Sequence, residues 1–175
     1  MTNMQSKQDF RQALSLLSAA VNIISTDGAC GRFGLTASAV CSVTDSPPTV
    51  LVCINRNSSI HEALLGNRAL CVNILPGHQE DVARQFAGMT DVPPAERFSG
   101  GEWRKGDSGQ PVLDDALASL EGTVVDVKEV GSHSVVFVEI EHIHVRDEGE
   151  SLTYFGRNFH RLGRSAPADQ PTSVS

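Results

Sequence analysis

Short runs of apolar and β-branched residues, each bounded by glycine, proline or polar positions, recur along the chain. This pattern is typical of β-strands and predicts them over residues 21–25, 33–43, 49–54, 69–75, 118–130, 133–145 and 152–155. Apolar positions at helical spacing predict helices over residues 10–17, 60–65 and 79–86. Because strands outnumber helices and follow one another closely, the pattern predicts a mainly β fold, an antiparallel barrel with a few short helices.

Two segments do not follow this pattern. Residues 87–115 are rich in glycine and proline, which predicts a long loop over one edge of the barrel. Large apolar residues are nearly absent from residue 163 onwards, so residues 163–175 are predicted to be a disordered tail. The length of 175 residues favours a single domain, which we place at residues 1–162.

The composition of the chain restricts the kinds of molecule that we expect it to bind. The formal net charge is −7, which argues against binding a nucleic-acid backbone, because that affinity rests on clustered lysine and arginine. The N-terminal residues lack the basic segment and apolar run of a signal peptide, and no segment reaches the roughly 18 consecutive apolar residues that a membrane span needs. These features predict a cytoplasmic protein that binds neither nucleic acid nor membranes.

The four cysteines, Cys30, Cys41, Cys53 and Cys71, show no CxxC spacing. Three of them lie in apolar strand-like runs, where a free thiol behaves as a small hydrophobic side chain. We therefore expect reduced core residues, with disulfides or metal ligands as the alternative.

Residues 33–65 carry the strongest indication of a ligand. Residues 36–39 are small or hydroxylated, so a planar ring could lie close to the backbone and accept or donate hydrogen bonds there. Residues 46–48 predict a turn, and residues 49–54 predict a strand buried on both faces. Ser58 or Ser59 is placed to cap the next helix, whose N-terminus, beside Arg56, would suit a phosphate group. The alternative is that this serine is simply a helix cap.

Six sequence blocks, in this order, carry a resemblance to a known protein family: SLLSAAVNIIST, GLTASAVCSVTDSPPTVLVCIN, CVNIL, FAGMT with ERF, GSHSVVFVEI and YFGRNF. Through them, residues 10–160 resemble the short flavin reductases that serve two-component aromatic hydroxylases, such as the hydroxyphenylacetate and chlorophenol monooxygenases. The resemblance implies a split β-barrel and a homodimer that binds FMN or FAD. It also implies that NADH or NADPH reduces the flavin, which is then released to a separate monooxygenase that hydroxylates an aromatic compound. We favour FAD and NADH.

The resemblance also implies site residues. Those expected along the flavin ring are Thr36, Ala37, Ser38, Ala39, Val40, Ser42 and Val43. Those expected at the ribityl and phosphate end are Asn57, Ser58, Ser59, Ile60, His61, Glu62 and Ala63. Ala87 and Gly88 are expected near the flavin, with Phe98 as a further candidate.

The nicotinamide nucleotide is expected at two further blocks. His133 matches the histidine of a glycine-x-histidine motif that positions the nicotinamide, and Tyr154, Phe155, Gly156 and Arg157 match the last block. The family often has an acidic residue directly before the histidine, whereas this chain has Ser132, which leaves the histidine tautomer open. Hydride transfer between the two cofactors requires no catalytic acid–base pair, so no catalytic side chain is expected.

Three other interpretations stay open at this level. The sequence GDSGQP around Ser108 is similar to the nucleophile block of chymotrypsin-like proteases, although no upstream histidine has the matching context. His142 and His144 alternate on one predicted strand and could bind a metal, or could simply face solvent on an edge strand. A split barrel could also bind flavin or haem without catalysis.

Overall fold

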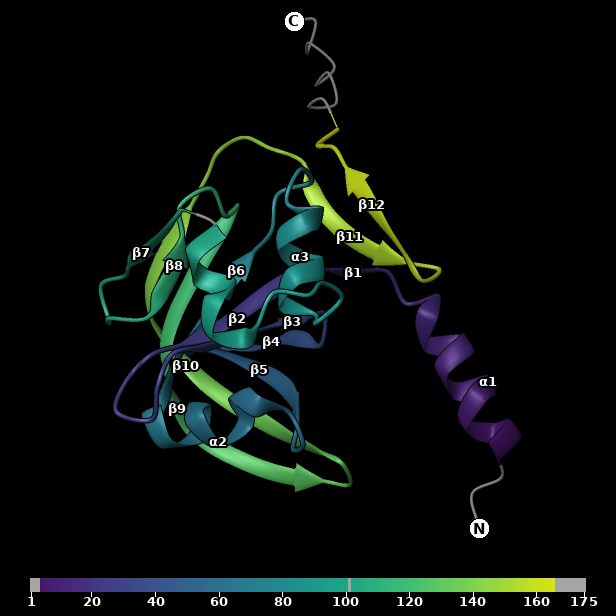
Figure 1. The fold of residues 1–175 in the computed structure, drawn as a ribbon, viewed down its shortest axis with the longest axis horizontal. Coiled ribbons are helices and arrows are strands. Elements are labelled where there is room, and N and C mark those ends of the chain that lie inside the picture. Colours follow the sequence, from purple (N-terminus) through teal and green to yellow (C-terminus); the bar gives the residue numbers. More distant parts are fainter. Residues whose placement is uncertain (1–3, 101, 166–175) are drawn as a thin grey trace, which may run out of the picture.

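The computed structural model describes residues 4–100 and 102–165. Its helices are α1 (Met4–Ser15), α2 (Ser59–Asn67), α3 (Glu80–Phe86) and the short 3₁₀ helix η1 (Pro94–Gly100). Its strands are β1 (Ala19–Ala20), β2 (Asn22–Thr26), β3 (Phe33–Ala37), β4 (Val40–Asp45), β5 (Pro48–Asn55), β6 (Ala69–Ile74), β7 (Trp103–Lys105), β8 (Pro111–Leu113), β9 (Ala118–Val130), β10 (His133–Val145), β11 (Ser151–Phe155) and β12 (Asn158–Leu162). The predicted mainly β architecture is confirmed (Figure 1).

A seven-stranded antiparallel sheet forms the body of the molecule, in the order β3-β2-β6-β9-β10-β5-β4. Its two edge strands, β3 and β4, are consecutive in the chain and are joined by Ser38 and Ala39 alone. A two-residue link cannot span an open sheet of this width, so the sheet curls until its two edges meet. A three-stranded sheet, β1-β11-β12, and the β7–β8 hairpin complete the fold.

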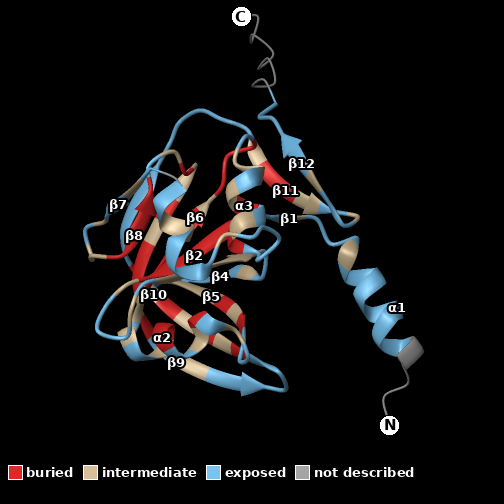
Figure 2. Cartoon of the chain, viewed as in Figure 1, coloured by how far each residue is buried: buried red, intermediate tan, exposed pale blue. Residues whose placement is uncertain are grey.

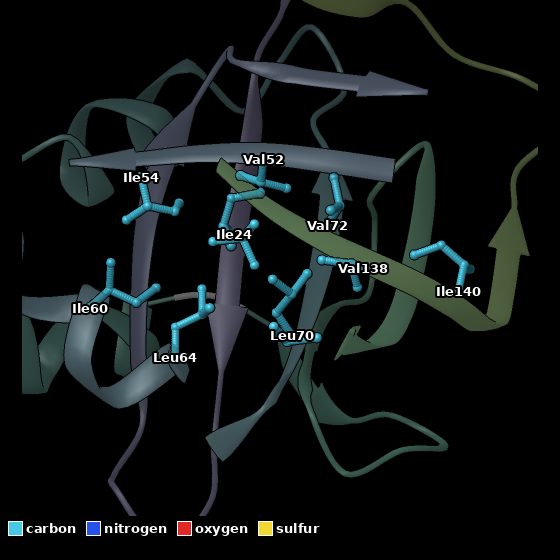
Figure 3. Close-up of a cluster of buried hydrophobic side chains, with 11 residues drawn as sticks. Ile24, Val52, Ile54, Ile60, Leu64, Leu70, Val72, Val138 and Ile140 are labelled. Atoms are coloured by element: carbon cyan, nitrogen blue, oxygen red, sulfur yellow. The ribbon is translucent and has the colours of Figure 1, made fainter. Parts of the chain in front are cut away.

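Alternating side chains of the central strands build the core. Along β10, Val136, Val138 and Ile140 are buried, and they pack against Val52 of β5 and Leu70 of β6 (Figure 3). Helix α2 closes this end of the barrel with Ile60 and Leu64. Figure 2 shows the burial concentrated inside the sheet, whereas α1 stands away from the barrel with an exposed surface.

Several predicted elements need correction. Residues 33–43 form two strands instead of one, because the chain leaves one sheet edge after Ala37 and joins the other at Val40. Residues 87–115 contain η1 and the β7–β8 hairpin instead of a plain loop. Strand β5 buries Val52 and Ile54 but leaves Leu51 and Cys53 only half-buried, so the expected burial of both faces is wrong for the single chain.

Other expectations hold only in part. The first helix begins at Met4 and ends at Ser15, earlier than predicted at both ends. All four cysteines are free, but only Cys71 is fully buried, while Cys30 and Cys41 are exposed. Residues 166–175, most of the predicted tail, lie outside the described residues.

Candidate functional site

The end of β3 forms the first part of the site. A pocket of about 190 Å³ is lined by Val21, Thr36, Ser38, Ala87, Met89, Tyr154 and Phe159. The Thr36 hydroxyl donates to the carbonyl of Ala83 at 2.5 Å, which fixes the strand against α3. The fold therefore brings together the predicted flavin residues Thr36 of β3, Ser38 directly after that strand and Ala87 directly after α3, and it adds the predicted nicotinamide residue Tyr154.

An apolar groove continues from this pocket along the small residues. It has a volume of about 620 Å³ and is lined by Leu17, Ser18, Ala19, Ala20, Asn22, Ser38, Ala39, Val40, Cys41, Leu51, Cys53 and Ile74. Because Ser38 and Ala39 have short side chains and link the two sheet edges, a flat ring can approach the backbone here. Ser42 and Val43 are exposed farther along β4, outside the lining of this groove.

A second region lies at the start of α2. A pocket of about 660 Å³ is lined by Arg56, Asn57, His61, Glu62, Leu65 and Ser132. Ser58 occupies the N-cap position, but its hydroxyl donates to the Asn55 carbonyl at 2.7 Å and caps no helical N–H group. The first-turn N–H groups of α2 therefore receive no side-chain cap, which is the arrangement that a phosphate group can satisfy.

Two predicted residues of α2 face the wrong way for side-chain contact with a ligand. Ile60 and Ala63 are 1% and 5% exposed, and the side chain of Ile60 belongs to the core of the barrel. Ser59 is exposed at the helix start. Any contact that Ile60 or Ala63 makes with a ligand would therefore come from backbone atoms.

Strand pairing brings His133 beside this second region. His133 is the first residue of β10 and lies opposite Asn55 of β5, and the N–H of Arg56 donates to the carbonyl of Ser132 at 2.9 Å. Nδ1 of the exposed His133 ring lies 2.9 Å from Ser132 Oγ, within hydrogen-bonding distance. His61 Nε2 lies 2.9 Å from Oγ of the buried Ser134, so α2 is tied to the same end of β10.

The last predicted block lies elsewhere in the chain. Tyr154 to Arg157 belong to the β11–β12 hairpin, which Figure 1 places far from the start of β10. Gly156 and Arg157 both have positive φ, 59° and 65°, and form the hairpin turn. The N–H of Gly156 donates to the Ser15 carbonyl at 2.7 Å, and Arg157 donates to Gln12 at 3.2 Å, so this turn holds α1. Within one chain, the predicted nicotinamide residues are therefore divided between two places.

The remaining flavin candidates follow α3. Gly88 is exposed and has a φ of 73°, which suits the turn after the helix. Phe98 packs against Phe86 and Trp103, with ring centroids 5.0 Å and 4.9 Å apart, and lies over Gly34. Its ring therefore supports the back of β3 and does not line the groove.

Sequence reasoning missed several lining residues. Leu51 and Cys53 of β5 line the groove because alternate residues of this strand face outward, and Phe159 lies opposite Tyr154 in the β11–β12 ladder. Phe159 is part of the YFGRNF block, which was the available signal.

The surroundings of Ser108, His142 and His144 do not support the protease and metal-site interpretations. Ser108 lies in the turn between β7 and β8, where its hydroxyl contacts the carboxylate of Glu121 and, within the part of the chain that the structure describes, hydrogen-bonds to no histidine. His142 and His144 are exposed on β10, past the end of its pairing with β5, and the described residues contain no cluster of three or more metal-ligating side chains. No helix within the described ranges has the length and apolar character that a membrane crossing requires.

The chain is similar in sequence to known flavin reductases along most of its length. The flavin reductase like domain matches residues 14–163. The chain is 54% identical over 156 residues to the 4-hydroxyphenylacetate 3-monooxygenase reductase component of Pseudomonas aeruginosa, covering 89% of this chain and 92% of the relative. It is 47% identical over 159 residues to the FMN reductase (NADH) RutF of Stutzerimonas stutzeri, covering 91% and 90%.

A solved structure supports the same assignment. The crystal structure of a putative flavin reductase from Haemophilus somnus superposes with a TM-score of 0.84 at 40% identity, covering 89% of this chain and 98% of that one. The split-barrel fold expected from the sequence is thereby confirmed. The family match spans nearly the whole described chain, and the protein belongs to the flavin reductase like domain family.

Proposed function

We propose that the protein is an NADH-dependent flavin reductase that reduces free FAD or FMN and supplies it to a separate monooxygenase acting on an aromatic compound. The observation that carries the proposal is the apolar groove at Ser38, Ala39 and Val40, where both sheet edges meet and the backbone is open to a flat ring. The name of the 54% identical relative, a reductase component of a monooxygenase, supports the partner.

The redox chemistry, hydride transfer from nicotinamide to flavin, is supplied by the two bound cofactors. The chain has to bind and orient them. Ser38 to Val40 form a wall for the flavin ring, the start of α2 and Arg56 attract its phosphate end, and His133 orients the nicotinamide. Ser132 Oγ lies 2.9 Å from His133 Nδ1, so Ser132 contacts the ring from the position at which the family often has an acidic residue.

We further propose that the working unit is a homodimer. The groove is open on one side, and α1 exposes Phe10 and Leu14 at 64% and 49%, while Leu17 at the rim of the groove is 68% exposed. A second copy covering these surfaces would also allow His133 of one chain to approach the β11–β12 hairpin of the other. Light scattering coupled to size-exclusion chromatography tests this, and a monomeric mass at micromolar concentration would contradict it.

FAD and NADH are the preferred substrates in this proposal. The proposed location is the cytoplasm, since the exposed thiols of Cys30 and Cys41 suit a reducing compartment. The deciding experiment follows NADH oxidation by its absorbance, with FAD, with FMN or without flavin, and in parallel with NADPH. Rapid oxidation that depends on added flavin is the expected result. Flavin binding without oxidation by either nicotinamide would instead identify a non-catalytic flavin-binding protein.

A further inference from the structure

Arg56 connects two parts of the second region. Its backbone N–H donates to the Ser132 carbonyl at 2.9 Å, and its Nη1 donates to the Gly131 carbonyl at 3.5 Å. Its Nη2 lies 3.4 Å from Oε2 of Glu129, near the end of β9. The guanidinium is therefore held by the β9–β10 turn, the turn that leads into His133.

The same arginine lines the pocket of about 660 Å³ at the start of α2, together with Asn57, His61 and Ser132. A phosphate group in this pocket would attract the Arg56 guanidinium, whose bidentate geometry suits phosphate oxygens. Glu129 competes for that guanidinium, because a carboxylate offers it a similar pair of acceptors. The Arg56 and Glu129 side chains are 44% and 63% exposed, so solvent screens their ion pair and a ligand can replace it at little cost.

We propose that Glu129 sets the affinity for the phosphate-bearing end of the flavin by competing for Arg56. This inference rests on the proposed function and adds a residue to it that lies outside the pocket lining. The competition weakens the hold on a product that has to leave, because reduced flavin is released after every turnover. Glu129 thus acts through Arg56 as a positioning residue that tunes the affinity, with no contact to the reacting atoms.

The test compares two flavins that differ in the phosphate. Glu129→Gln keeps the size of the side chain and removes its charge, so we expect the Kd of FMN to fall about two- to fivefold, the range of an exposed ion pair. Riboflavin has the same ring without phosphate, and its Kd should stay unchanged. Glu148→Gln, the same charge change on an exposed residue of the β10–β11 connection, is the matched control and should leave both constants unchanged.

A double-mutant cycle distinguishes competition for Arg56 from direct electrostatic repulsion between the Glu129 carboxylate and the phosphate group. In the Arg56→Ala background, Glu129→Gln should have no effect on FMN binding, since the guanidinium for which Glu129 competes is gone. An undiminished effect there, or equal tightening of riboflavin and FMN by Glu129→Gln, would overturn the inference while leaving the reductase proposal intact. Failure of the unmodified protein to bind either flavin would overturn both. Quenching of flavin fluorescence gives all of these constants.

Discussion

The backbone N–H of Ser108 donates to Oε2 of Glu121 at 2.9 Å, and the Ser108 hydroxyl donates to the same oxygen. The N–H of Asp107 donates to the other oxygen at 3.0 Å, so the turn between β7 and β8 wraps around the carboxylate of Glu121, a residue that is only 4% exposed. The serine that suggests a protease nucleophile in the sequence therefore serves to satisfy a buried charge.

Ser108→Ala should lower the free energy of unfolding by about 1.5–3 kcal/mol, the value of a hydrogen bond to a charged group, and leave flavin reduction unchanged. Urea unfolding and NADH oxidation measure the two effects. Ser99→Ala removes a hydroxyl from an exposed position and should cost much less stability. Loss of all activity in Ser108→Ala, with the fold retained, would restore the hydrolase hypothesis.

Cys71 gives a prediction about pH. Burial raises the pKa of its thiol, and the nearby carboxylate of Glu121 raises it further. Above a pH of about 8.5, the ordinary thiol value, the unfolded chain loses this proton while the folded chain keeps it, so stability falls as the pH rises. In urea unfolding at successive pH values, Cys71→Ala should show a shallower loss than the unmodified protein, by up to about 1.4 kcal/mol per pH unit. Parallel curves for the two proteins would contradict the assignment.

Gly122 lies in β9, opposite Ile140 of the neighbouring antiparallel strand β10. A Cβ at this position would collide with the backbone carbonyl of Glu139, which cannot move away because β10 is paired on both sides there. Gly122→Ala should therefore destabilise the fold by about 3 kcal/mol or more, measured by thermal or urea unfolding. Gly163→Ala, where the added Cβ meets nothing within 4 Å, is the control and should change stability by less than about 0.5 kcal/mol. Equal stability of the two variants would contradict the close approach.

Local pattern explains which elements the sequence predicts well. The boundaries of β9 and β10 agree with the sequence prediction because both strands are long, rich in β-branched residues and flank the turn at Gly131. The break after Ala37 has no proline or glycine to mark it and arises only because the chain changes sheet edges. Strand β12 is short and polar, and only its pairing with β11 defines it.

The same distinction applies to the residues of the candidate site. The small residues of the groove and the helix start are visible as local motifs, whereas their relation to His133 depends on the register of β5 with β10. Pairing Asn55 with His133 brings Arg56 to the β9–β10 turn, and no local signal in the sequence specifies this register. The competition between Glu129 and a phosphate group for Arg56 could therefore be inferred only from the structure.

His133→Ala should raise the KM for NADH several-fold and leave the Kd of the flavin nearly unchanged, because His133 lies at the strand start while the flavin ring is proposed to rest on Ser38 to Val40. His142→Ala is the matched control, since His142 is an exposed histidine of the same strand beyond the site. Steady-state kinetics with NADH, together with flavin fluorescence titration, separate the two constants. An equal loss of nicotinamide and flavin affinity in His133→Ala would mean that the residue supports the pocket as a whole. An unchanged KM would instead place the nicotinamide away from β10, at the β11–β12 hairpin with Tyr154.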